Sequence, residues 1–260
     1  MRASRGASGM IIIKSESDLA VMREAGRRVA AVRDEVAARV APGVTTAELG
    51  EWAQERILAT GAENAFLGYR GFPGKICVSV NDVVVHGIPG DRRIEVGDVV
   101  SIDVGLRYRG FVGDTAVTVL VGVTDPRVVS LVRTAERALA AGIASAVPGK
   151  RVSDISHAVQ EVAEAAGFSV VRDFVGHGIG RRMHEDPQVP NFGAPGRGAT
   201  LRPGMTLAIE PMINMGPRDV KVDSDGWTVR TVDGSPSAHV EHMVAIREGP
   251  AEILTLGVPS

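Results

Sequence analysis

SIDVGLRYRGFVGDTAVT, residues 101–118, places two aspartates inside an apolar β pattern. Gly110 near its middle supplies turn chemistry, so the stretch predicts a β-hairpin. Asp103 and Asp114 lie at equal distances from the midpoint between Tyr108 and Arg109. A hairpin centred on that midpoint places the two carboxylates opposite each other, with Cβ atoms roughly 5 Å apart. Like charges at that separation among apolar side chains repel strongly, so a cation is expected between them.

The residues nearby indicate which cation this is. Arg107 and Arg109 are the nearest basic residues, but neither is expected in the flat part of the ladder. Divalent metal ions accept oxygen ligands from facing carboxylates. We therefore expect Asp103 and Asp114 to hold a metal.

The size and composition of the chain limit the classes of function. With 260 residues the chain can bury a sizeable core, in one large domain or two small ones. A formal charge of −2 without a run of basic residues argues against DNA as a partner. Cys77 is the only cysteine, so neither a disulfide framework nor a cysteine zinc site is expected. The apolar run Met10–Ile13 is too short for a signal peptide or a membrane span. We expect a cytoplasmic, monomeric protein without a membrane segment.

The chain repeats itself at a spacing of about 106 residues. Helices are expected after the capping pairs Ser15 with Asp18 and Thr45 with Glu48, and again over 128–146 and 152–166. The stretch 97–103 matches 204–210, with an acid ending the same apolar strand in both. We expect a flexible segment over 1–11 and one domain over 12–260, with internal halves of about 12–125 and 126–250. The expected class is α+β, with an antiparallel sheet in two duplicated halves.

The second half carries its own pair of acids. Glu210 and Glu241 lie symmetrically about Asp225-Gly226, a strong turn signal. If the halves pack about a pseudo-twofold axis, these acids converge with those of the first half, and His177 lies nearby. Four carboxylates carry four negative charges, which two divalent ions balance. One imidazole among oxygen ligands suits Mn, Fe, Co or Zn.

Each candidate residue also has a simpler interpretation. A single acid of this kind is more often part of a salt bridge or a turn; the four together are not explained that way. His86 is as typical of a core or capping histidine as of a catalyst, whereas His184 follows a Gly-rich turn that exposes side chains. An apolar neighbourhood favours Cys77 as an inert packed thiol. The GHGIG run, 176–180, lacks the spacing and the following helix of a phosphate loop.

Several motifs together resemble the type I methionine aminopeptidases. They are LGYRGFPGKICVSVNDVVVHGIPG, SIDVG with GFVGDTA, GHGIGRRMHEDPQVPNFG, LRPGMTLAIEPMI, DGWTVRTVDGSPSAHVEH and EILTL. The match extends from about residue 12 to residue 256. The resemblance implies the pita-bread fold of creatinase and the aminopeptidases, around a central dinuclear metal site. It also implies removal of the initiator methionine from nascent polypeptides, with possible transient binding to the ribosome.

The resemblance further implies a role for each matching residue. Asp114 and Glu241 would bridge two divalent ions, Asp103 would hold one, and His177 and Glu210 the other. His86 and His184 would contact the scissile peptide, and Glu210 could shuttle a proton. The remaining implied positions are Tyr69, Cys77 and Trp227 around the methionine side chain, with Phe72, Phe66 and Met183 beside them, and Asn81, Val83 and Ser237 at a sodium or potassium site.

Two other functions remain open from the sequence. One is a proline-specific aminopeptidase or dipeptidase of the same fold, although such enzymes usually carry a separate N-terminal domain. Fewer than ~20 residues before the first expected helix leave no room for one. The other is a metal-free binding protein on this fold, such as a ribosome-associated factor, but such relatives lose metal ligands and all five are present here.

Overall fold

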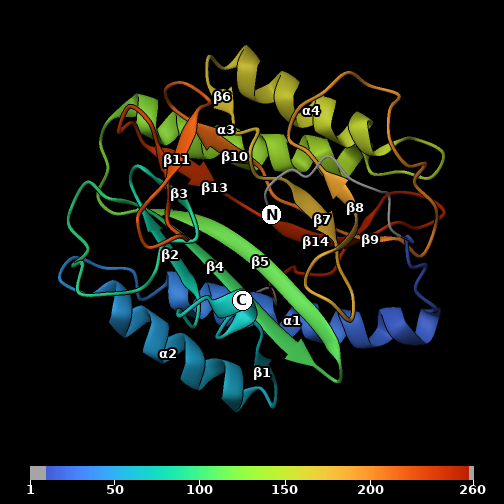
Figure 1. The fold of residues 1–260 in the computed structure, drawn as a ribbon, viewed down its shortest axis with the longest axis horizontal. Helices are drawn as coiled ribbons and strands as arrows, with labels where there is room; N and C mark the ends of the chain where they lie inside the picture. Colours follow the sequence, from blue (N-terminus) through green and yellow to red (C-terminus); the bar gives the residue numbers. More distant parts are fainter. Residues whose placement is uncertain (1–9, 258–260) are drawn as a thin grey trace.

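The computed structural model describes residues 10–257, so residues 1–9 of the segment expected to be flexible, 1–11, lie outside the described residues. Figure 1 shows the elements in chain order. The first half contains α1 Glu16–Ala37, α2 Thr46–Ala59, β1 Glu63–Asn64, the 3-10 turn η1 Tyr69–Gly71, β2 Cys77–Val80, β3 Val83–Val85, β4 Val99–Tyr108 and β5 Phe111–Leu120. The second contains α3 Pro126–Ser145, α4 Val152–Ala165, β6 Ser169–Val170, β7 Gly176–Gly178, β8 Glu185–Val189, β9 Thr206–Ile209, β10 Met212–Asn214, β11 Val220–Val222, β12 Val229–Thr231, β13 Ser237–His239, β14 His242–Ala245 and β15 Glu252–Ile253.

The helices begin where the capping residues predict. Ser15 and Asp18 form a reciprocal capping box at the start of α1, and Thr45 and Glu48 form another at the start of α2. Helix α3 begins two residues before its expected start, because Asp125 caps it and a proline occupies its first turn. The expectation for four helices in two pairs is confirmed.

The hairpin of β4 and β5 forms, but its register differs from the expected one. Asp103 pairs with Ala116, and Asp114 pairs with Gly105, so the two aspartates are diagonal neighbours and do not face each other directly. The cause is the turn, which lies at Arg109 and Gly110, with φ angles of 48° and 81°. Two consecutive positive φ angles are what a tight two-residue hairpin turn requires. Both aspartates nevertheless project from the same face of the hairpin, because residues two apart on a strand share a face.

The second half forms one long, interrupted hairpin about Asp225-Gly226. Its three strand pairs are all centred on the same point of the sequence, between Asp225 and Gly226. The pairs are β9 with β14, β10 with β13, and β11 with β12. Ile209 pairs with His242 on one side and Met212 with His239 on the other, so Glu210 lies opposite Glu241 between two ladders. The expected placement of these glutamates is confirmed, although intervening loops break the hairpin into three pieces.

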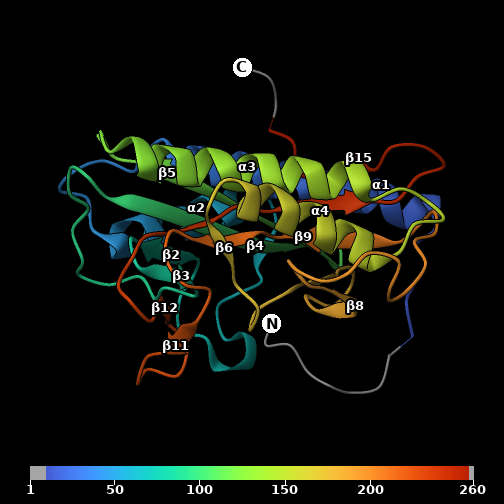
Figure 2. The ribbon, with the colours of Figure 1, turned by 90° about the horizontal axis from the view of Figure 1, so that it is seen from above.

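The two halves meet where β5 touches the residue that precedes β14. Ala116 and Glu241 form an isolated antiparallel bridge, in which the Glu241 N–H donates to the Ala116 carbonyl over 3.0 Å. This bridge joins the sheet of β1, β4, β2 and β5 to the sheet of β15, β14, β9, β7 and β8. Helices α1 and α3 lie on one side of the joined sheets, while β3, β11 and β12 lie on the other (Figure 2).

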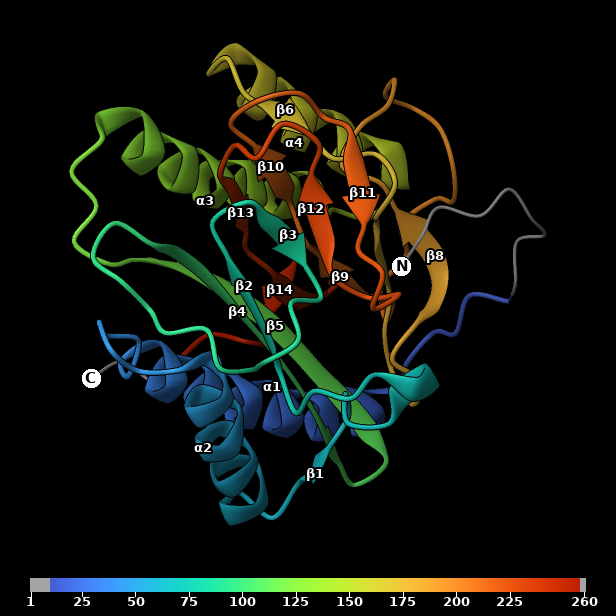
Figure 3. The same ribbon diagram turned by 60° about the vertical axis from the view of Figure 1, so that its left-hand side comes forward.

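Each half has its own apolar core, and a separate small sheet lies beside them. Residues of α1 and α2 pack with β2 and β4 in one cluster, and residues of α3 and α4 pack with β9, β10 and β13 in another. Strands β3, β12 and β11 lie side by side in a small separate sheet (Figure 3). None of the helices in the part of the chain from 10 to 257 combines the length and hydrophobicity needed to cross a bilayer.

Candidate metal centre

Neighbouring strands carry the five candidate metal ligands to one face of the joined sheets. Along one row across the strands, Cys77 pairs with Asp103, Asp103 with Ala116, and Ala116 with Glu241. Glu210 lies opposite Glu241, and His177 pairs with Ala208, two residues before Glu210. Because cross-strand partners share a face, this register places these side chains together.

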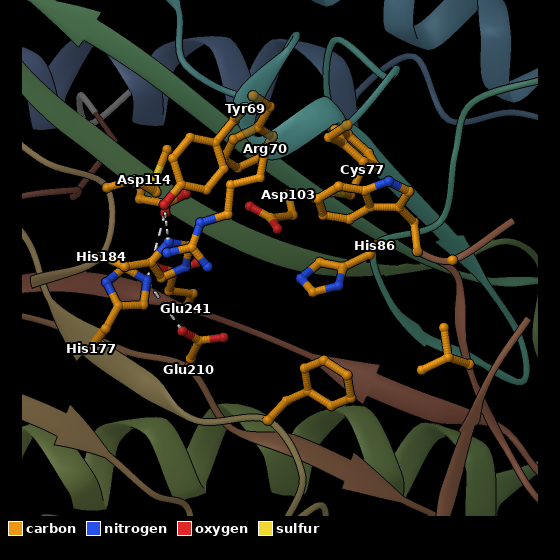
Figure 4. Close-up of a pocket in the computed structure, with 17 residues that line it drawn as sticks. Tyr69, Arg70, Cys77, His86, Asp103, Asp114, His177, His184, Glu210 and Glu241 are labelled. Carbon is orange, nitrogen blue, oxygen red and sulfur yellow. Dashed lines mark hydrogen bonds and ion pairs between the residues drawn. The ribbon is translucent and has the colours of Figure 1, made fainter. Parts of the chain in front are cut away.

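The ligand atoms converge closely. Single ligand atoms of Asp114, His177 and Glu241 all lie within 4.8 Å of one another. His177 Nε2 lies 3.5 Å from Glu210 Oε1 and 4.0 Å from Asp114 Oδ2. Asp103 borders the same cavity, and Figure 4 shows the four carboxylates and His177 around one space.

The hydrogen bonding of this group fits a bound cation. His177 Nδ1 lies 2.9 Å from the Gly178 carbonyl, which can only accept, so Nδ1 donates and Nε2 presents a lone pair to the carboxylates. One buried oxygen on each of Asp103, Asp114 and Glu241 lacks a hydrogen-bond donor within the described chain. Buried acceptors facing one another without donors are costly unless a cation lies between them. This donor set of carboxylate oxygens and one imidazole suits a transition metal.

Burial changes the protonation of these groups. It raises the pKa of Asp103 to about 8, with the Glu210 charge adding to the effect, and that of Glu210 to about 7. Burial, followed by the neighbouring carboxylates, raises the pKa of Asp114 and Glu241 well above the usual range. Burial lowers the pKa of His177 to about 3, so its imidazole is neutral and free to coordinate.

An aromatic cavity of about 350 Å³ opens beside the carboxylates. All eight predicted substrate-contact residues line it: Phe66, Tyr69, Phe72, Cys77, His86, Met183, His184 and Trp227. The Phe72 and Trp227 rings meet edge to face at 5.1 Å. Burial raises the pKa of the Cys77 thiol well above its usual value, which agrees with an inert packed cysteine.

The two candidate catalytic histidines flank the metal ligands. The Tyr69 hydroxyl and His184 Nδ1 are 2.7 Å apart, and the His184 ring lies 4.3 Å from that of His177. The His86 ring packs edge-on against Phe174 at 5.5 Å, with Trp227 also nearby. Burial lowers the pKa of both histidines, to about 3 for His86, so both rings are neutral.

The residues predicted for a monovalent cation lie outside this cavity. The Ser237 N–H donates to the Asn81 carbonyl over 2.9 Å, and the Ser237 hydroxyl donates to the Ile213 carbonyl and to Asn214 Oδ1. Val83 begins β3, two residues beyond Asn81, which has a φ of 55°. The three therefore lie close in the fold, and their role as a cation site stays a prediction.

The sequence interpretation missed several residues at this site. Arg70, Phe174, Val222 and Gly226 line the cavity, and the imidazole Nε2 of His239 lies 3.7 Å from Glu210 Oε2. His239 could have been found, because it lies two residues before Glu241 and so shares its strand face. Arg70 lies in a turn with a φ of 51°, a backbone conformation that no sequence signal predicted.

Buried carboxylates and a neutral imidazole beside an aromatic cavity define a metal-dependent enzyme on a duplicated antiparallel fold. Comparison with known proteins identifies the family. The model of metallopeptidase family M24 matches residues 20–248. Methionine aminopeptidase 1 of Bacillus subtilis is 50% identical over 246 residues, which cover 95% of this chain and 99% of the relative.

Solved structures agree with the sequence relatives. The crystal structure of methionine aminopeptidase from Thermotoga maritima superposes with a TM-score of 0.93 at 48% identity, covering 95% of this chain and 99% of that one. Prolidase from Pyrococcus furiosus shares only the fold, with a TM-score of 0.78 at 21% identity, and this chain covers 66% of it. The chain belongs to metallopeptidase family M24, within its methionine aminopeptidase branch, and has the pita-bread fold.

Proposed function

We propose that the protein is a methionine aminopeptidase, which removes the N-terminal methionine of polypeptides by metal-dependent hydrolysis. The observation that carries the proposal is one cavity that joins the buried carboxylates to an apolar, aromatic wall. A single methionine side chain suits that wall, because a thioether packs favourably against aromatic ring edges. Phe66, Phe72 and Trp227 supply the rings, and the Cys77 and Met183 side chains complete the wall.

Two divalent ions per chain are the cofactor that we propose, with Co, Mn, Fe and Zn as candidates. Asp114 and Glu241 would serve both ions, Asp103 would hold one, and His177 and Glu210 the other. Two such ions balance the charge of the four buried carboxylates. When bound, divalent ions supply Lewis acidity and a water molecule whose pKa is lowered toward neutrality.

The protein's own groups position the substrate and move protons. A Tyr69 hydroxyl that donates to Nδ1 of neutral His184 would leave the ring proton on Nε2, which would donate to the carbonyl oxygen under attack. His86, which lies across the site from His184 in Figure 4, would hydrogen-bond the peptide nitrogen as it leaves. The Glu210 carboxylate would shuttle the proton that the attacking water loses.

The physiological setting is part of the proposal. The substrates would be nascent polypeptide N-termini in the cytoplasm, processed by a monomer that associates transiently with the ribosome. A sodium or potassium ion would bind near Asn81, Val83 and Ser237. The contact between Ser237 and Asn81, which brings β13 to the turn before β3, supports this last point.

The test is release of free methionine from the peptide Met-Ala-Ser in the presence of Mn²⁺ or Co²⁺. His177→Ala should lose roughly 100-fold or more of kcat/KM, because it removes the lone pair that faces the carboxylates. His157→Ala in α4 is the matched control, because His157 does not line the cavity.

Three results would contradict the assignment. A fully active His177→Ala variant would contradict the metal site. Cleavage of Ala-Pro-Ser in preference to Met-Ala-Ser would indicate a proline-specific enzyme of the same fold. A protein that binds no divalent metal and cleaves neither peptide would be a binding protein.

A further inference from the structure

A buried ion pair lies directly behind the loop that carries His184. Lys14 Nζ and Glu185 Oε2 are 2.6 Å apart, and the two side chains are only 4% and 1% exposed. Lys14 precedes α1 and Glu185 begins β8, so the pair joins segments that are 171 residues apart in sequence. In the described chain, neither residue lines the cavity that contains the carboxylates. A buried pair of this kind contributes little net stability and is more informative as a geometric constraint.

Glu185 organises the loop that precedes it. Its Oε1 accepts the Arg182 N–H over 3.2 Å, and the Gly180 N–H donates to the Arg182 carbonyl over 3.2 Å. The loop between these contacts carries Met183 and His184, which both face the cavity. His184 therefore sits one residue before a side chain that is fixed at both carboxylate oxygens.

Lys14 is itself held in place. Its backbone N–H donates to the Gly204 carbonyl over 2.8 Å, and its ammonium also donates to the Ile12 carbonyl over 3.2 Å. Gly180 packs tightly against this pair, because a Cβ at Gly180 would lie 2.6 Å from Lys14 Cε and 2.7 Å from Glu185 Oε1. The segment before α1 thus supports the loop from the side away from the cavity.

We propose that Lys14 and Glu185 are positioning residues, which hold His184 in the geometry that the reaction needs. The inference rests on the proposed function. His184 is held on the cavity side by Tyr69, at 2.7 Å from its Nδ1, and lies between Tyr69 and His177 in Figure 4. The ion pair of Lys14 and Glu185 fixes the same loop on the side away from the cavity. Small displacements of a catalytic group reduce rates by up to roughly 100-fold without changing the chemistry.

The experiment compares two single variants with their combination. Lys14→Met and Glu185→Gln each leave one buried partner without its counterpart, so both should lower the melting temperature and kcat. The combination removes both charges and should recover most of the melting temperature. We expect its kcat on Met-Ala-Ser to remain about 10- to 100-fold lower than that of the unmodified enzyme, because the loop is no longer fixed. KM and the amount of bound Mn²⁺ should not change.

Two further measurements separate positioning from general stability. In a His184→Ala background, adding the Lys14→Met and Glu185→Gln changes should lower kcat by no more than about twofold, because the group that they position is already gone. The control combination is Arg23→Met with Glu252→Gln, which removes an ion pair between α1 and β15 and should leave kcat unchanged.

The outcomes distinguish this inference from the proposed function. An unmodified enzyme that fails to release methionine would refute the function itself. An active enzyme whose combined variant regains full kcat together with its melting temperature would overturn the positioning role. Equal additional losses with and without His184 would overturn it as well.

Discussion

The protonation of Asp103 and Glu210, at the proposed metal site, affects the stability of the fold. Both side chains have a folded-state pKa above the ordinary value, about 8 and about 7, because burial disfavours their charged forms. Between roughly pH 4 and pH 8 these two carboxyl groups therefore bind more protons in the native protein than in the unfolded chain, so their contribution lowers stability as the pH rises. Burial lowers the pKa of His86, His177 and His239 to about 3, which has the opposite effect up to about pH 7.5, because the histidines of the unfolded chain lose their protons around pH 6.5.

We expect the metal-free protein to lose stability between pH 7.5 and pH 8.5, where the histidines are neutral in both states and the carboxylates dominate. The expected loss is roughly 1 kcal/mol or more, since each pKa unit corresponds to about 1.4 kcal/mol. Urea unfolding midpoints in the presence of a chelator measure it. Saturating Mn²⁺ should reduce this dependence of stability on pH, and Asp103→Asn should reduce it in part. A midpoint that rises over this pH interval would contradict the assigned pKa directions.

The residues that the sequence identified are those whose chemistry conflicts with their surroundings. Asp103 and Asp114 stand out because charged residues are unexpected in an apolar hairpin, and Glu210 stands out because it repeats the position of Asp103 in the matching stretch of the second half. His239 was missed, because one imidazole in a polar stretch carries no such conflict. Its contact with Glu210 depends on the pairing of β10 with β13, which is a tertiary feature.

At the level of elements, local signals predicted the helices well and the hairpin turn less well. Capping boxes depend only on residues three apart, so α1 and α2 begin where they were expected. The turn of β4 and β5 lies one residue further along because Arg109 takes a positive φ, which arginine rarely does. This shift makes Asp103 and Asp114 diagonal neighbours but keeps them on one face. The two carboxylates therefore still face the same cavity, although the predicted register was wrong.

A buried relay connects α1 to the metal ligand Glu241. Arg33 Nη1 donates to the Thr115 hydroxyl over 2.8 Å, and that hydroxyl donates to the Glu241 carbonyl over 2.9 Å. Thr115→Val keeps the shape but removes both hydrogen bonds. We expect a loss of about 1 to 3 kcal/mol in unfolding free energy. Metal affinity, measured by calorimetric titration, should also fall by roughly 10-fold or more.

A threonine at a helix end provides the control for this relay. The Thr60 hydroxyl donates to the Ile57 carbonyl at the end of α2, away from the cavity. Thr60→Val should lower stability without changing metal affinity. If Thr115→Val behaves in the same way, the relay stabilises the fold but does not orient Glu241.

At the level of the whole molecule, the repeated sequence predicts two similar halves but not how they join. Residues 97–103 and 204–210 become corresponding strands, β4 and β9, each at the centre of its sheet. The seam depends on contacts that have no counterpart within either half. Two of these are the bridge of Ala116 with Glu241, and the Thr118 hydroxyl that donates to the His239 carbonyl over 2.7 Å. Internal symmetry cannot specify such contacts, because the repeat describes each half alone and not the surface between the halves.

The proposed metal ligands lie on both sides of this seam, and amide hydrogen exchange can test whether bound metal links the two halves. Asp103 and Asp114 belong to one half, and His177, Glu210 and Glu241 to the other, so opening the seam would require the proposed ligands to separate. The bridge at this point consists of two backbone hydrogen bonds between Ala116 and Glu241, of 3.0 and 3.4 Å. We expect Mn²⁺ to slow exchange about tenfold or more in peptides covering Ala116 and Glu241.

Global stabilisation by a bound ion slows exchange at every amide that opens only by complete unfolding. The informative comparison is therefore between the seam and α4, Val152–Ala165, which packs against α3 within one half. If the ions act as a cross-link, the seam peptides gain more protection than α4, because their local opening is suppressed as well. Equal slowing at both places would mean that the metals stabilise the fold without holding its halves together. A His177→Ala variant, with one ligand of the second half removed, should reduce the gain at the seam first.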